Sequence, residues 1–121
     1  MKMWFHPSLK DVEAAFNAKD TKPLQKKFNR FAEHILDALE IVKAADTLSD
    51  LQSFYYLYPH IMRKDRRHKY ERFSISPAGK KNSLRITLVC SDEEDKTIVL
   101  EKIDLFSTAV IIEEVGIHYG D

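Results

Sequence analysis

The sequence predicts an α+β fold, in which a short N-terminal strand is followed by two to three helices packed on a small antiparallel sheet with a three-stranded meander. Two patterns predict this class. Apolar residues recur every three or four positions in the first half, which indicates amphipathic helices, and they alternate with polar residues in the second half, which indicates half-buried strands. With 121 residues and 44% apolar composition, we expect one domain, residues 1–121, large enough to bury its own core.

The chain begins with a predicted edge strand and a first helix. Residues 2–6 are short and aromatic, which suits an edge strand, and Pro7 ends it. Ser8 is the expected N-cap of a helix that starts at Leu9. The helical pattern breaks within residues 17–21, so this helix is short.

A second helix has the strongest pattern in the chain. Thr21 as the cap and Pro23 inside the first turn predict its start, because the missing N–H of proline costs nothing there. Apolar side chains then follow one helical face for about six turns. This stripe consists of Leu24, Phe28, Phe31, Ile35, Leu39 and Val42.

Residues 47–58 predict a short third helix, with Ser49 as its cap and Pro59 just after its end. The aromatic run 54–58 is compatible with a surface on which nucleobases stack, but its helical spacing favours core packing. The side chains expected to pack inward are Leu51, Phe54, Tyr55 and Leu57.

The second half predicts an antiparallel meander with one buried face. Its strands are predicted at residues 70–76, 84–90 and 97–106, separated by turns at 77–82 and 91–96. The residues from Ser107 onward fit a helix start, but residues 110–112 are an equally good strand. Cys90, the chain's one cysteine, lies in an apolar run and is expected to be a buried thiol rather than a nucleophile.

Positive charge is concentrated in one segment of a chain whose formal charge is zero. Residues 60–85 carry a net +7, residues 1–59 are balanced, and residues 86–121 carry a net −7. A cationic segment that is also expected to be structured suggests a phosphate-bearing or polyanionic ligand.

The composition also excludes several classes of protein. Three glycines are too few for a glycine-rich nucleotide loop, and the histidines and acids show no metal-ligand spacing, so we expect neither a cofactor nor a metal site. The N-terminus has no signal-peptide pattern, and no apolar run approaches the roughly 18 residues of a membrane span. We therefore expect a cytoplasmic protein without membrane contact.

The order of these elements resembles the RelE/ParE-like toxins of type II toxin–antitoxin systems. The matching segments are residues 3–12, 69–75, 83–88 and 95–106, which are similar to the family's opening strand with its helix start and to its three later strands. The resemblance implies an endoribonuclease that cleaves mRNA on the ribosome without a metal, and an antitoxin partner encoded by an adjacent gene. One departure is that residues 106–110 carry no positive charge where many members of the family have it.

RNA cleavage by its own 2′-hydroxyl needs a proton acceptor, a cation on the scissile phosphate and a proton donor for the leaving oxygen. Arg85 matches the arginine that begins the family's second central strand, and we predict that it stabilises the phosphate charge. Lys69 and Arg72 are predicted phosphate or proton-transfer groups, and His68 a general base. The predicted RNA contacts are Arg63, Lys64, Arg66, Arg67, Lys80 and Lys81. His118 and Tyr119 lie near the C-terminus, where such families sometimes keep an acid or base.

Two other functions remain open on the sequence alone. The scaffold can serve as a noncatalytic interaction protein, either an inhibitor of a protein target such as gyrase or a degenerate toxin that only binds its partner. The charge distribution alone also suits a nucleic-acid-binding accessory protein, whose affinity would depend steeply on salt.

Overall fold

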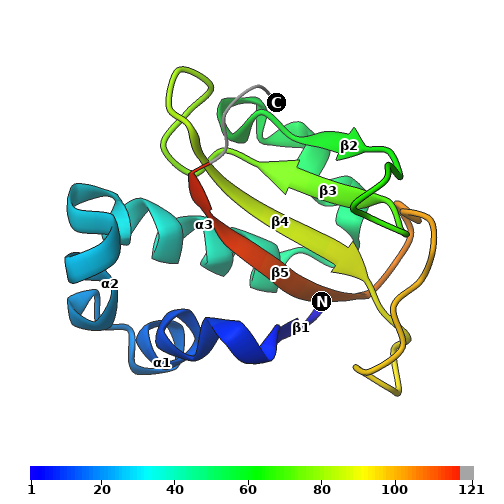
Figure 1. Ribbon diagram of the computed structural model, residues 1–121, viewed down its shortest axis with the longest axis horizontal. Coiled ribbons are helices and arrows are strands. Elements are labelled where there is room, and N and C mark those ends of the chain that lie inside the picture. The colour runs from blue at the N-terminus through cyan, green and yellow to red at the C-terminus, as the bar shows by residue number, and fades with distance from the viewer. Residues whose placement is uncertain (118–121) are drawn as a thin grey trace.

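The computed structural model describes residues 1–117, which form an α+β domain built on one five-stranded sheet (Figure 1). The sheet has the order β1-β5-β4-β3-β2. Strands β2 to β5 follow one another as an antiparallel meander, and β1 pairs in parallel with β5, so the sheet is mixed rather than purely antiparallel. The strands are β1 Lys2–Phe5, β2 His60–Met62, β3 Arg72–Ile75, β4 Leu84–Cys90 and β5 Ala109–Ile117.

The prediction of a strand at residues 97–106 is wrong, and β5 takes its place in the meander. The segment from Asp92 to Ser107 is a run of turns and bends, and its one ladder contact is an isolated bridge between Ser91 and Val99. Aspartate side chains explain the irregularity, because Asp95 and Asp104 each accept a hydrogen bond from the backbone N–H two residues later. Such local bonds compete with a strand ladder.

The predicted long helix is divided by a 3-10 turn. Helix α2 is Lys22–Phe28, the turn is Asn29–Phe31, and helix α3 is Ala32–Ala44. Asn29 interrupts the helix because it has a φ of 50° and a ψ of −125°, which a helical residue does not adopt. Leu24, Ile35, Leu39 and Val42 nevertheless are all fully buried, so the stripe faces one core on both sides of the break.

Two predicted N-caps are also wrong. Before helix α1, Lys10–Ala18, residues Pro7–Leu9 form a 3-10 turn whose cap is His6, and its Nδ1 accepts the N–H of Ser8. Residues 47–58 form two 3-10 turns, Leu48–Ser53 and Tyr55–Leu57, instead of a third α-helix. The cap there is Thr47 rather than Ser49, because Thr47 and Asp50 form a capping box.

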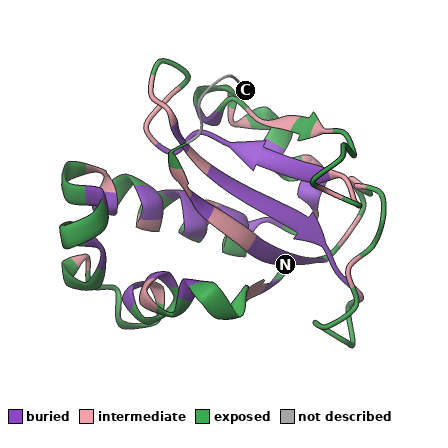
Figure 2. Cartoon of the chain, in the orientation of Figure 1, coloured by how far each residue is buried: buried purple, intermediate pink, exposed green. Residues whose placement is uncertain are grey.

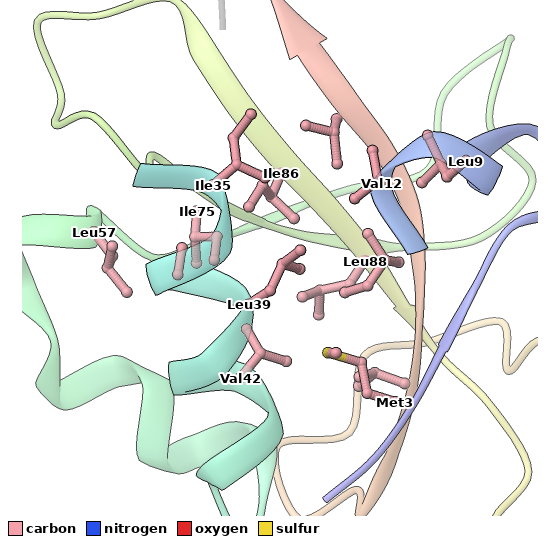
Figure 3. Close-up of a cluster of buried hydrophobic side chains, with 14 of the residues drawn as sticks. Met3, Leu9, Val12, Ile35, Leu39, Val42, Leu57, Ile75, Ile86 and Leu88 are labelled. Atoms are coloured by element: carbon pink, nitrogen blue, oxygen red, sulfur yellow. The ribbon is translucent and has the colours of Figure 1, made fainter. Parts of the chain in front are cut away.

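Helices α1 and α3 cover one face of the sheet and enclose the core between them. Figure 3 shows Ile35, Leu39 and Val42 of α3 directed toward Ile86 and Leu88 of β4. All five side chains are fully buried. Cys90 is buried on this same face, as expected, and burial raises the pKa of its thiol.

The alternation of side chains along β3 and β4 defines a second face, which we call the outer face. Because Leu84, Ile86 and Leu88 belong to the core, Arg85, Thr87 and Val89 lie on the opposite side of β4. On β3, Phe73 and Ile75 are core, so Arg72 and Ser74 lie on the outer face. Both strands are buried along most of their length, while the loops at their ends are exposed (Figure 2). Between residues 1 and 117, no helix is long and apolar enough to cross a membrane.

The core packing predicts a large effect of truncating Leu39. The side chain is fully buried, so Leu39→Ala leaves a cavity and we expect a loss of about 2–5 kcal/mol in the free energy of unfolding. Urea denaturation measures this loss. The matched control is Glu40→Ala, at the next and exposed position, for which we expect a change within about 0.5 kcal/mol. Equal effects of both changes would contradict the packing of Leu39 in the core.

Candidate nucleic-acid interface

Four polar residues form a continuous strip across the outer face. Ser74 of β3 and Thr87 of β4 are register partners, and Arg72 and Arg85 lie two residues away from this pair in opposite directions. The two arginines therefore share a face but do not meet, since about 13 Å of strand separates their positions. We call these four residues, Arg72, Ser74, Thr87 and Arg85, the outer strip.

The centre of the outer strip carries unused hydrogen-bonding capacity. The hydroxyls of Ser74 and Thr87 are buried and have no hydrogen-bond partner within residues 1–117. The Nε of Arg72 is in the same situation. Ser74, Thr87 and Arg72 are almost completely buried, so the centre of the outer strip lies inside the molecule, and the exposed charges at its two ends are the groups that a ligand can reach.

Arg85 is anchored at the end of the outer strip where β3 turns into β4. Its Nη1 donates to the backbone carbonyl of Leu84 at 2.8 Å and also to that of Asn82 in the 77–82 turn. These bonds orient the half-buried guanidinium and tie it to the turn. The predicted catalytic arginine therefore has a structural contact in addition to any contact with phosphate.

Asp65 organises the opposite end of the outer strip. One of its carboxylate oxygens accepts the N–H groups of Arg67 at 2.8 Å and His68 at 2.9 Å, and it lies 3.0 Å from Nδ1 of His68. The other oxygen is 3.5 Å from Nη2 of Arg72, whose side chain is only 5% exposed. The backbone hydrogen bond from Arg67, followed by the side-chain bond from His68, lowers the pKa of Asp65.

The structure therefore brings together only some of the predicted catalytic residues. His68 and Arg72 meet at Asp65, and Lys69 is exposed next to His68 in the chain. Arg85 lies at the far end of the outer strip. A single reaction centre that uses all four residues is inconsistent with this separation.

The predicted RNA contacts fall into the same two groups. Arg63, Arg66 and Arg67 are exposed in the loop before β3, and Lys64 pairs there with Glu101. Lys80 and Lys81 are exposed in the 77–82 turn, at the other end of β3. The basic segment is thus two cationic ends joined by the outer strip, and not one continuous patch.

A hollow beside the outer strip is lined by residues that no sequence pattern marked as functional. It has a volume of about 320 Å³, and its lining includes Trp4 of β1, Glu113 of β5, and Tyr70 in the loop before β3. Glu114, the register partner of Thr87, places a further carboxylate beside the outer strip. Both glutamates lie on β5, in a region that the sequence pattern predicted equally well as a helix or a strand. No pattern in the sequence therefore indicated that these carboxylates lie next to the cationic segment.

This arrangement places cationic groups at two points and an imidazole at one of them, and these are the kinds of group that phosphate binding and proton transfer require. The arginines and lysines supply charge, and the imidazole of His68 is held in place by a carboxylate, as a general base requires. Among residues 1–117, no group of three or more His, Cys, Asp or Glu side chains is arranged to hold a metal ion. His118 and Tyr119 lie outside the described residues.

Comparisons of the chain with protein-family models, with curated proteins and with solved structures found no match.

The contacts of Asp65 predict its titration. The folded pKa is lowered, so the stabilisation that these contacts give is present above the unfolded pKa and is lost as the pH falls through the folded pKa. We expect the amide NMR shifts of Arg67 and His68 to titrate with a midpoint below 3.8, the ordinary value for Asp65. In Asp65→Asn this transition should disappear while the turn persists, because the amide oxygen still accepts. A midpoint at or above 3.8 would contradict the hydrogen bonds that Asp65 accepts in this loop.

Proposed function

We propose that this chain is a RelE/ParE-like toxin of a type II toxin–antitoxin system that cleaves ribosome-bound mRNA and is neutralised by an antitoxin from an adjacent gene. The observation that carries the proposal is the outer strip with a cationic group at each end, on the sheet face opposite the helices. The order of strand, helices and antiparallel meander supports the resemblance at the level of architecture. A cytoplasmic location is part of the proposal, because the substrate is mRNA on the ribosome.

The proposed chemistry uses the 2′-hydroxyl of the RNA as the nucleophile, so it needs no metal and no cofactor. His68 accepts the proton from that hydroxyl, with Asp65 holding the ring in position. The 2′-oxygen then bonds to phosphorus as the P–O5′ bond breaks, which leaves a 2′,3′-cyclic phosphate. Arg72 stabilises the charge that develops on the phosphate, and Lys69 donates a proton to the leaving 5′-oxygen. Arg85 binds a second phosphate at the other end of the outer strip, since it is too distant to act on the same one.

A noncatalytic interaction protein is the second candidate, whether it inhibits a protein target such as gyrase or only binds its antitoxin. Two observations favour it. Arg72 is almost fully buried and is already paired with Asp65, which limits its access to a phosphate. Phe106 is 80% exposed, and no basic residue follows it before β5.

Expression in bacteria tests the toxin proposal directly. We expect that inducible expression without the antitoxin arrests growth and degrades mRNA, and that His68→Gln relieves both effects because the proton acceptor is lost. Arg85→Ala should also relieve them through weaker phosphate binding. The matched control is His34→Gln on the exposed surface of α3, which should arrest growth like the unmodified chain. Growth curves and mRNA blots on cells with equal protein levels are the measurements.

The possible outcomes separate the two candidates. Growth arrest with intact mRNA would overturn the endoribonuclease and leave the noncatalytic protein. Normal growth at full expression would overturn the toxin proposal altogether. Melting temperatures of the purified variants show whether a loss of effect follows from the changed group or from unfolding.

The exposed arginines in the loop before β3 predict a salt-dependent contribution to RNA binding. Each phosphate contact contributes about −0.7 to the slope of log affinity against log salt for a single strand. We expect the double variant Arg66→Ala, Arg67→Ala to flatten this slope by about 1.4. Lys26→Ala on helix α2 removes another exposed positive charge, far from the outer strip, and should leave the slope unchanged. Titration of a labelled RNA at several salt concentrations measures the slope for each variant. Equal slopes for the double arginine variant and the unmodified chain would show that this loop does not contact the RNA.

A further inference from the structure

Three tyrosines, two on a 3-10 turn and one just after it, are exposed in a segment whose helical spacing favours core packing. Tyr55 is 84% exposed, Tyr56 is 64% exposed, and Tyr58 just after the turn is 44% exposed. The one side chain of this turn that is buried is Leu57. The expected inward packing of Tyr55 is therefore wrong, because a 3-10 turn has three residues per turn and presents only one side to the core.

The turn holds these rings in a defined position. Leu57 anchors it in the core, and its carbonyl accepts the N–H of Ser76 at the end of β3 at 2.6 Å. Tyr58 is in the left-handed region, with a φ of 49° and a ψ of 57°, and its N–H donates to the carbonyl of Tyr55 at 2.9 Å. Few residues other than glycine adopt this conformation, so the surrounding structure keeps Tyr58 there.

Tyr55 and Tyr58 line one side of a surface hollow of about 370 Å³, together with Gln52 and Pro59. Tyr56 belongs to the other side of the turn, where it lines a separate hollow with His34 of α3. We call the first of these, formed by Gln52, Tyr55, Tyr58 and Pro59, the tyrosine hollow.

Positive charge lies directly against the tyrosine hollow. The Nζ of Lys80 is 4.7 Å from the ring centre of Tyr58, which is a cation–π contact. The ring of His60 is 6.1 Å from that of Tyr58, and His60 lies on the outer face because it is the register partner of Ser74. The tyrosine hollow therefore continues the turn end of the outer strip.

We propose that the tyrosine hollow stacks a base of single-stranded RNA while Lys80 and Lys81 bind the adjoining phosphates. Exposed aromatic rings beside lysines match a ligand that combines flat faces with negative charge, which is the composition of a nucleotide. A rigid turn also reduces the entropy lost when the rings bind. This inference rests on the proposed function, since it extends the same RNA path beyond Arg85.

Binding of a short labelled single-stranded RNA to the full chain, followed by fluorescence anisotropy, tests the proposal. We expect the double variant Tyr55→Ala, Tyr58→Ala to lower the affinity about tenfold or more, and Tyr55→Phe, Tyr58→Phe to keep it, because stacking needs the ring and not the hydroxyl. The control Tyr56→Ala removes a tyrosine of the same turn whose exposed fraction lies between those of Tyr55 and Tyr58, and this variant should bind like the unmodified chain. The unmodified chain should bind an oligomer of equal length with abasic sites more weakly than it binds the normal oligomer. The double alanine variant should bind the abasic oligomer as strongly as the unmodified chain does.

Two results would overturn the proposal: unchanged affinity in the double alanine variant, or equal affinity of the unmodified chain for the abasic and the normal oligomer. Either result would leave the tyrosine hollow as a surface for a protein partner. Failure here is distinguishable from failure of the toxin proposal. If the chain arrests growth and cleaves mRNA but the tyrosine variants bind RNA normally, only the stacking contact is refuted. If RNA binding depends on the tyrosines but growth continues, only the toxin proposal is refuted.

Discussion

The pairing of β5 with both β1 and β4 is the constraint on which the rest of the structure depends. β5 joins β1 in parallel from Ala109 to Ile112 and joins β4 antiparallel from Val110 to Ile117, with one register shift between Ile112 and Glu114. Parallel neighbours need a long crossover connection, and here it contains all the helices and the other three strands. The helices therefore pack on one face of the sheet, and β3 and β4 present their other face as the outer face.

The same constraint determines where the charge goes. β3 and β4 bury alternate side chains in the core, so Arg72 and Arg85 are placed on the outer face, at opposite ends of the outer strip. Asp65 then compensates the buried guanidinium of Arg72 and orients His68. A buried arginine without such a partner would be strongly destabilising, so one carboxylate provides both stability and the arrangement of the proposed catalytic end.

The two ends of the outer strip differ in what they can do. The Asp65 end combines a carboxylate, an imidazole and a guanidinium, which suits proton transfer and charge stabilisation. The Arg85 end combines anchored charge, two exposed lysines and the tyrosine hollow, which suits binding. A single-stranded RNA that follows β3 would contact both ends. In the proposed function, the Arg85 end binds the RNA and the Asp65 end carries out the chemistry.

The sequence by itself determined the elements whose signal is local: the first strand, helix α1, the apolar stripe from Leu24 to Val42, strand β4, the burial of Cys90, and the cationic character of residues 60–85. Tertiary structure alone decided that β5 replaces residues 97–106 in the sheet, that Asn29 breaks the long helix, that Tyr55 faces outward, and that the cationic segment is divided into two ends. The reason is that periodicity records which side chains share a face within one element. Strand pairing, 3-10 turns and contacts such as Asp65 with Arg72 depend on segments that meet only after the chain has folded.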